Sequence, residues 1–242
     1  MMLTFRNHAA TSVVLAVITM SGSACTTWHR VGSPETGVSA DQGLLQLFDP
    51  ASTWRQLGRI VSDGPLPFIG SVAYVAGPGN STKAVVGISL ANRAFSFERS
   101  GDVYQARYRV EYTISSPGRA PVVLNRDGVL RVGTQQEAGR SDESLLLQEE
   151  FALEPCNYEL TVRVMDPLNQ SSGIATSSIA VPTFTPGSTT APIFAYEVEG
   201  RGTRADSLKM VMNSRGSLAY GGDTLLIYLE GYGFTSPTGV PV

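Results

Sequence analysis

Two adjacent carboxylates, Glu149 and Glu150, are residues whose types and spacing could suggest catalysis. A pair of carboxylates can cleave a glycosidic bond when the two groups flank it. Around them, Leu145, Leu147, Phe151 and Leu153 predict a β-strand. Because neighbours in a strand point to opposite faces, Glu149 and Glu150 are expected to lie on different sides of a sheet. They do not predict a glycosidase site.

Other residues that often carry catalysis or bind metals are few. The chain has two histidines, His8 and His29, which are too few for His-dependent triads or multi-His metal sites. Cys156 precedes a predicted strand, with no cation or helix start nearby to activate its thiol, and we interpret it as a half-buried turn residue. Asp127 is followed by glycine, a pair typical of turns rather than of calcium loops, and its segment can form a bent strand or a hairpin about these two residues. We expect no enzyme, no metal site and no cofactor.

Composition and charge narrow the class of protein further. Of the 242 residues, 42% are hydrophobic and 16% are charged, and 25 are glycine and 14 proline, which is typical of folded, turn-rich β structure. The formal net charge is -3, and the lysines and arginines form no cluster. Nucleic-acid binding depends on a basic surface and is therefore not expected.

The N-terminus has the composition of a signal peptide over residues 1–24. Arg6 precedes an apolar run from Ala9 to Met20, and small residues separate this run from Cys25. The run is shorter than the roughly 20 residues that a membrane-spanning helix needs. Export is therefore expected.

The segment SGSAC, which ends at Cys25, resembles a bacterial lipoprotein signal. The resemblance implies that Cys25 is acylated and becomes the new N-terminus, so that lipid anchors the protein in the bacterial outer membrane or periplasm. Cleavage after Ala24 without lipidation is the alternative, and it would leave a thiol that could pair with Cys156. The polar residues 25–42 are expected to form a flexible tether.

The strongest structural pattern is the alternation from Tyr104 to Ile114, in which every second residue is apolar. Such a pattern predicts a β-strand with one buried and one exposed face. The segment from Tyr158 to Val164 repeats it, so the two strands are expected to share a core that includes Tyr108, Val110, Leu160 and Val162. A sugar-binding groove lined by Tyr104, Tyr108 and Tyr112 is the alternative.

About seven strands fit between Pro67 and Phe184, the number expected of an immunoglobulin-like domain. We therefore predict an all-β fold, an antiparallel immunoglobulin-like β-sandwich, over residues 66–184. Tyr158 stands at the start of the penultimate strand, where a tyrosine corner would bond its hydroxyl to the preceding loop.

The segments on either side of the sandwich are predicted from spacing and composition. Residues 43–65 are expected to form a short helical segment, with a helix from Pro50 to Ser62. Residues 185–191 are rich in Thr, Ser, Gly and Pro and are interpreted as a linker. Residues 192–242 supply only about three strands, too few for an independent sandwich, and are interpreted as a partial second β domain.

A series of β segments resembles the N-terminal part of bacterial proteins named for a GWxTD motif. These segments are LPFIGSVAYVAGPG, AFSFERSGDVYQARYRVEYTI, ELTVRVMDPLNQSSG, VPTF, PIFAYEVEGRG and DTLLIYLEGYG. The GWxTD motif itself is absent, and the resemblance implies that it would follow Val242 in a longer protein. No particular activity or functional residue is implied, only a β-domain protein of the cell envelope.

Two hypotheses for function follow. In the first, the chain is a lipid-anchored envelope protein whose β-sandwich is a non-catalytic interaction or structural module for other envelope proteins. In the second, it belongs to an exported carbohydrate-active or other hydrolytic protein whose catalytic part lies C-terminal to this chain. An apolar or edge-strand surface would favour the first, whereas an aromatic groove or converging carboxylates would favour the second.

Overall fold

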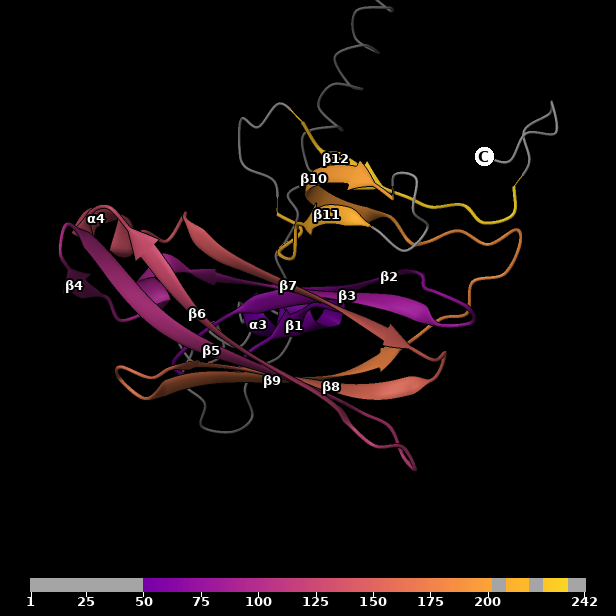
Figure 1. Cartoon of the computed structure of the whole chain (residues 1–242), viewed down its shortest axis with the longest axis horizontal. Helices are drawn as coiled ribbons and strands as arrows, with labels where there is room; N and C mark the ends of the chain where they lie inside the picture. Colours follow the sequence, from indigo (N-terminus) through magenta and orange to yellow (C-terminus); the bar gives the residue numbers. More distant parts are fainter. Residues whose placement is uncertain (1–49, 202–207, 218–223, 235–242) are drawn as a thin grey trace, which may run out of the picture. The chain divides into compact units, whose positions relative to one another are not determined.

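A computed structural model describes residues 50–201, 208–217 and 224–234 of the protein. Figure 1 shows that these residues form mainly β-strands, joined by turns and short helical segments. The predicted all-β sandwich is therefore confirmed. The signal peptide at 1–24, Cys25 and the tether at 25–42 lie outside the described residues.

Two antiparallel sheets form the sandwich. The first sheet contains, in order, β1 (Ile60–Val61), β2 (Ile69–Ala76), β3 (Thr82–Ala91) and β7 (Ser144–Leu153). The second sheet contains β4 (Glu98–Ser100), β5 (Val103–Ser115), β6 (Val122–Val132), β8 (Asn157–Asp166) and β9 (Ser171–Ala180). Strand β5 lies in its interior, with β6 along one edge and β4 and β8 along the other. Two helical segments, η1 (Asn92–Ala94) and α4 (Gln135–Ala138), lie in the connections.

The strand order has immunoglobulin-like topology. The chain leaves β3 for β4, β5 and β6 in the second sheet, returns to the first sheet with β7, and crosses again to β8 and β9. As a result β7 pairs with β3, and β8 pairs with β5. Pairs between strands that are not consecutive produce the Greek-key arrangement of this fold.

The sandwich core lies between the facing sides of these two sheets. Its most buried residues alternate along three strands, and they are Val86, Ile88 and Leu90 of β3, Val110, Tyr112 and Ile114 of β5, and Leu160, Val162 and Val164 of β8. The predicted strands 104–114 and 158–164 thus lie within β5 and β8. Their regular pattern follows from one buried face each, because the opposite face of the second sheet meets solvent.

A third sheet packs against the outer face of the first. It contains β10 (Ile193–Gly200), flanked by β11 (Lys209–Met212) and β12 (Leu226–Tyr228). A second apolar cluster joins the two sheets and contains Ala73, Val75, Val85, Ile193, Ala195, Leu208, Met210 and Met212. Three strands were expected in residues 192–242, and they share a core with β2 and β3. Strand β3 is consequently buried on both faces.

The helix at the start of the described residues is shorter than predicted. Helix α3 spans Pro50–Gln56, and Ile60 belongs to strand β1. The chain turns at Gly58, whose φ of 73° lies in the left-handed region. Backbone hydrogen bonds from Gly58 N to Arg55 O (2.9 Å) and from Arg59 N to Trp54 O (3.0 Å) close the helix in a Schellman motif. The prediction of a helix to Ser62 was wrong because this glycine ends the helix inside the apolar stripe.

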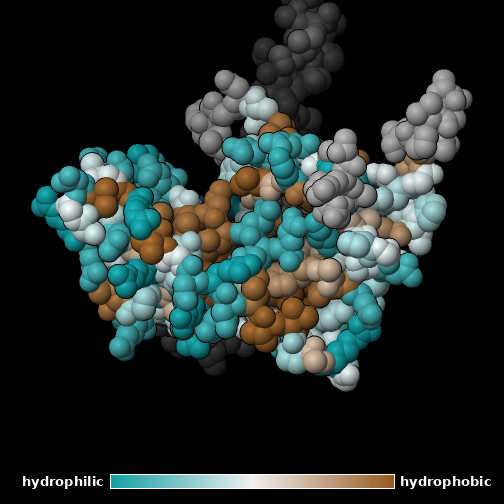
Figure 2. Space-filling model, in the orientation of Figure 1, coloured by the Kyte–Doolittle hydropathy of each residue, from teal (hydrophilic) through white to brown (hydrophobic). Residues whose placement is uncertain are grey.

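Some apolar side chains remain at the surface. Figure 2 shows them in several separate places on one face of the molecule. The more exposed ones include Val122 and Val123 of β6, and Phe194, Tyr196, Val211 and Ile227 of the third sheet. Val122 and Val123 lie in the second sheet, whereas Phe194 and Ile227 are direct cross-strand partners in the third sheet.

Candidate functional site

The free edge of β2 is the feature that positions the candidate site. The turn that joins β2 to β3 has a hydrogen bond from Gly77 N to Ser81 O, at 2.9 Å. The β2–β3 register continues from this pair without a shift, with Tyr74 opposite Ala84 and Val72 opposite Val86. In antiparallel strands every second residue is hydrogen-bonded to the neighbouring strand. Counted back from Gly77, the odd-numbered residues of β2 bond to β3. The N–H and C=O groups of Val72 and Tyr74 therefore point away from β3.

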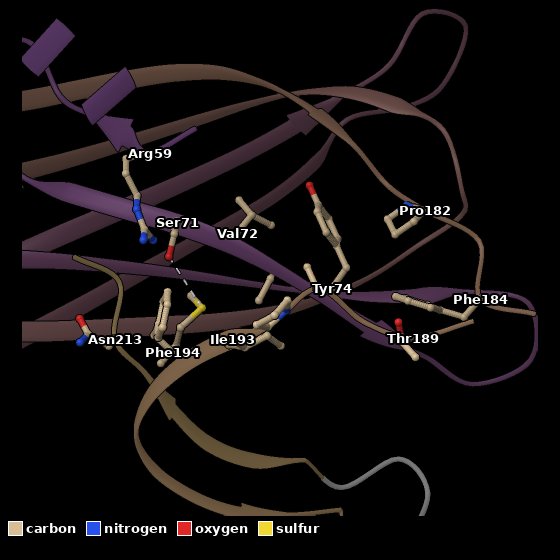
Figure 3. Close-up of a pocket in the computed structure, with 14 residues that line it drawn as sticks. Arg59, Ser71, Val72, Tyr74, Pro182, Phe184, Thr189, Ile193, Phe194 and Asn213 are labelled. Atoms are coloured by element: carbon tan, nitrogen blue, oxygen red, sulfur yellow. Dashed lines mark hydrogen bonds between the residues drawn. The ribbon is translucent and has the colours of Figure 1, made fainter. Parts of the chain in front are cut away.

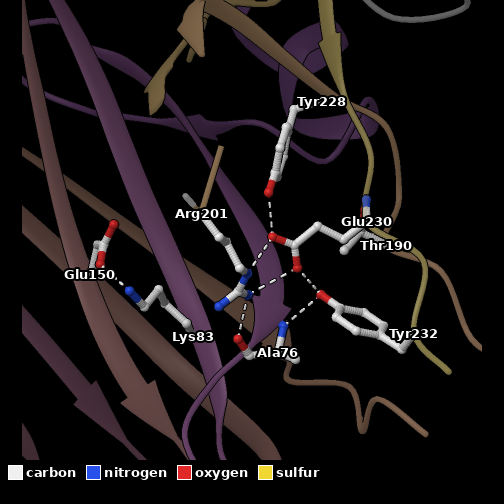
Figure 4. A network of polar contacts seen from close by, with 8 residues as sticks. All are labelled: Ala76, Lys83, Glu150, Thr190, Arg201, Tyr228, Glu230 and Tyr232. Atoms are coloured by element: carbon white, nitrogen blue, oxygen red, sulfur yellow. Dashed lines mark hydrogen bonds and ion pairs between the residues drawn. The ribbon is translucent and has the colours of Figure 1, made fainter. Parts of the chain in front are cut away.

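Both ends of this edge are occupied. At one end, β1 pairs with Ile69 and Gly70. At the other end, the backbone N–H of Ala76 donates to the hydroxyl of Tyr232 at 2.8 Å, and Arg201 Nη2 donates to the Ala76 carbonyl at 2.5 Å (Figure 4). Between them, the edge-facing backbone groups of Val72 and Tyr74 have no hydrogen-bond partner in the described part of the chain.

A cleft with a volume of about 410 Å³ runs along this edge. Its lining comes from β2, from the segment between β9 and β10, and from the third sheet, and Figure 3 shows how these side chains surround it. Phe184, Ile193 and Phe194 supply apolar surface. Two further lining residues, Pro182 and Pro192, have no backbone N–H, so neither can donate a hydrogen bond to β2.

Arg59 lies at one end of the cleft. The Schellman motif fixes its backbone directly after α3 and before β1, and Figure 3 shows its guanidinium beside Ser71. Burial lowers the pKa of Arg59 from its usual value. Within the described residues the Arg59 side chain has no ion pair or hydrogen bond, and it is the one charged side chain that lines the cleft. A half-buried cation without an anion is electrostatically costly and favours the approach of one.

Tyr74 adds a second polar group beside the cleft. Burial raises the pKa of its phenol to about 12, so the hydroxyl is neutral at physiological pH. The arrangement offers a cation, a phenol, two backbone N–H groups and two carbonyls around an apolar space. The described lining contains no Asp, Glu, His or Cys. These groups can form hydrogen bonds with a bound molecule and attract an anion.

A polar network closes the Ala76 end of the cleft edge (Figure 4). Arg201 donates two hydrogen bonds to the Glu230 carboxylate, from Nε to Oε1 at 2.6 Å and from Nη2 to Oε2 at 2.9 Å. The hydroxyls of Tyr228 and Tyr232 also donate to this carboxylate. Burial alone would raise the pKa of Glu230, but the hydrogen bonds from Arg201, Tyr228 and Tyr232 outweigh burial and lower it. The network thus holds an ionised carboxylate and its cation together.

The residues predicted from the sequence lie elsewhere, in the sandwich. Val110, Leu160 and Val162 are at most 1% exposed, and Tyr108 is half-buried beside the same core. The hydroxyl of Tyr158 donates to the backbone carbonyl of Glu154 at 3.0 Å, which is the contact expected of a tyrosine corner. These five residues stabilise the fold and do not meet the cleft.

The candidate chemical residues considered in the sequence are in separate places. Glu149 pairs with Arg126 at 2.8 Å, whereas Glu150 pairs with Lys83 at 2.7 Å, as expected for neighbours on opposite faces of a strand. Asp127 lies within strand β6 and binds Arg109, so this segment forms the strand and not the hairpin, the two alternatives that the sequence left open. The Cys156 sulfur lies 3.6 Å from the hydroxyl of Ser116.

Sequence reasoning missed Arg59 and the edge of β2. A signal for the covered outer face was present, because Ala84, Val85 and Val86 are apolar at three consecutive positions rather than at alternating ones. The free edge itself has no sequence signal, since it depends on β1 being only two residues long.

Comparisons with protein-family models, with curated proteins and with solved structures found no match to this chain. Among residues 50–201, 208–217 and 224–234, no three His, Cys, Asp or Glu side chains lie close enough to hold a metal ion together. In the same ranges no helix has the length and apolar character needed to cross a membrane.

Proposed function

We propose that this chain is a non-catalytic interaction module that binds an extended segment of a partner protein along the free edge of β2. The carrying observation is that Val72 and Tyr74 direct two N–H and two C=O groups into an apolar cleft and have no described partner there. An edge strand of this kind is a template for one further strand.

Hydrogen bonds and apolar contacts would both stabilise an added strand at this site. Two residues with both backbone groups available can form four hydrogen bonds with a partner, each worth about 0.5–1.5 kcal/mol net. Apolar side chains of the partner would add to this by covering Ile193 and Phe194.

The proposal places the module at the bacterial cell envelope. The signal-like residues 1–24 and the SGSAC segment support export and acylation of Cys25, and the polar residues 25–42 supply a tether. Membrane attachment through lipid on Cys25 would limit the module to partners in the periplasm or on the same membrane. The resemblance to the β region of GWxTD proteins supports the same location.

Hydrogen exchange of the β2 amides tests the proposed function. A positional-scanning library of seven-residue peptides, made with free and with amidated C-termini, is passed over the immobilised full-length protein in detergent micelles. A retained peptide is expected to slow exchange at Val72 and Tyr74. The amides of Ser71 and Ala73 face β3 and serve as internal controls, because they are protected with or without peptide.

N-methylation of a retained peptide gives the matched control on the ligand. Methylation of an amide that faces β2, which is every second amide of the peptide, should abolish binding. Methylation of the amides between them should be tolerated. A library of which no member slows exchange at Val72 and Tyr74 would contradict the proposed function.

A further inference from the structure

The geometry of the β2 edge points to a specific ligand class: an apolar polypeptide C-terminus, bound antiparallel to β2 with its terminal carboxylate at Arg59. This inference rests on the proposed function and specifies the partner. It is carried by three observations: the position and direction of β1, the lone charge of Arg59, and the closure of the opposite end by Tyr232 and Arg201.

Strand β1 shows which end of an antiparallel ligand would meet Arg59. It runs antiparallel to β2 and pairs Ile60 with Gly70 on the same edge that the ligand would use. A ligand strand antiparallel to β2 would lie in line with β1 and run from Ala76 towards Val72. Its C-terminal end would therefore arrive where β1 begins, at Arg59 and Ile60.

The same position explains why a chain end is required. Ile60 already occupies the edge opposite Gly70, so a ligand cannot continue beyond Ser71 along β2. An internal segment would have to turn out of the cleft at this point, next to the helix end that precedes Arg59. A terminus simply stops there.

Charge selects a carboxylate for that terminus. Arg59 has no anionic partner among the described residues, whereas Arg201, near the other end of the edge, is neutralised by Glu230 at 2.6 Å. The Arg59 end thus carries unbalanced positive charge and the Ala76 end does not. The carboxylate would accept hydrogen bonds from the Val72 N–H and from the guanidinium, which is a charge-assisted contact.

The pleat of β2 gives the side-chain preference. Ligand residues opposite Val72 and Tyr74 would point to the same face as those side chains, and the residue between them would point with Ala73 towards the third sheet. Ala73, Ile193 and Phe194 line that side, so an apolar penultimate residue is expected. Asp and Glu at this position would bury a charge without a partner.

The test compares free and amidated C-termini of peptides retained from the library. Affinities are measured by fluorescence anisotropy with the full-length protein. We expect the free carboxylate to bind at least about tenfold more tightly than the amide, since hydrogen bonds to a charged group exceed neutral ones by that order. Arg59→Gln should remove this difference, and Arg59→Lys should keep part of it.

Arg107→Gln is the matched control, because Arg107 is an exposed residue of β5 that does not line the cleft. It should bind as the unaltered protein does. Equal affinities for free and amidated peptides, or an Arg59→Gln variant that still distinguishes them, would overturn the inference.

The experiments distinguish a failure of this inference from a failure of the proposed function. If amidated peptides bind equally well and still protect Val72 and Tyr74 from exchange, the edge binds internal segments: the proposed function stands and the assignment of a C-terminus is wrong. If no peptide in either form protects these amides, both are wrong.

Discussion

The hydroxyl of Tyr232 accepts a hydrogen bond from the backbone N–H of Ala76 at 2.8 Å, although the two residues are 156 positions apart in the chain. Through this contact the segment that follows β12 closes one end of the β2 edge. The same hydroxyl donates to Glu230, so it satisfies an edge amide and a buried carboxylate at once. The extent of the open edge therefore depends on a side chain from the C-terminal segment.

Replacing Tyr232 with phenylalanine should open the edge at Ala76. The variant loses the acceptor for the Ala76 N–H and one donor to Glu230, and its free energy of unfolding should fall by about 1–2 kcal/mol. Exchange of the Ala76 amide should become faster, while the Ala73 amide stays protected. Tyr196→Phe is the control, since Tyr196 is 45% exposed. Equal exchange rates at Ala76 in the two variants would contradict the assigned contact.

The Glu230 network should make stability depend on pH in the acidic range. Its contacts lower the pKa of Glu230 below the value of about 4.3 expected in the unfolded chain. A lowered folded-state pKa stabilises the protein above about pH 4.3, and this contribution is lost as the pH falls through the folded-state pKa. The stability difference between the unaltered protein and Glu230→Gln should therefore be largest near neutral pH and shrink below about pH 4.3.

Urea denaturation at pH 7, 5, 4 and 3 measures this difference. Glu197→Gln, an exposed residue of β10, controls for the loss of one carboxylate from the same sheet. A difference for Glu230→Gln that stays constant from pH 7 to pH 3 would show that its charge does not stabilise the fold.

Tyr158→Phe should destabilise the sandwich by about 1 kcal/mol or more. The variant loses the hydrogen bond to the Glu154 carbonyl, and the contact that Arg119 donates to the hydroxyl at 3.3 Å. The midpoint of urea denaturation measures the effect, and Tyr104→Phe, on the same sheet, is the control. An unchanged midpoint in Tyr158→Phe would remove the tyrosine corner as a source of stability.

Tyr112→Phe should stabilise the protein, whereas Tyr158→Phe should destabilise it. Tyr112 is 1% exposed, and its hydroxyl has no hydrogen-bond partner in the part of the chain that the structure describes. Burial raises the pKa of this phenol strongly, because the charged form would be desolvated. Removing a buried, unbonded hydroxyl should raise the free energy of unfolding by about 1 kcal/mol. A loss of that size in urea denaturation would show instead that the hydroxyl is bonded.

The strands of the second sheet were predictable because each has one solvent-exposed face. Solvent on one side imposes the strict alternation that identifies β5 and β8. Strand β3 lacks this pattern, since Val85 faces the third sheet while Ala84 and Val86 face the sandwich core. Its sequence indicates burial on both faces but carries no information on which element covers the second one.

The candidate site was not predictable from residue types. Val72 and Tyr74 act through their backbones, and every residue has the same backbone groups. They are selected by the turn at Gly77, which fixes the residues of β2 that face away from β3, and by β1, which begins only at Ile60. Arg59 gains its position from the Schellman motif, and the apolar spacing around Gly58 predicted a continuing helix there.

The double burial of β3 has a consequence for shortened forms of the chain. A protein that stopped at Phe184 would keep every strand of the sandwich, yet it would expose Val75 and Val85 to water. It would also lose Arg201 and Tyr232, so the backbone groups of Ala76 would join the unpaired edge. A longer open strand beside an apolar sheet face is the setting in which two molecules join edge to edge and aggregate. The C-terminal strands therefore cover an apolar sheet face as well as framing the cleft.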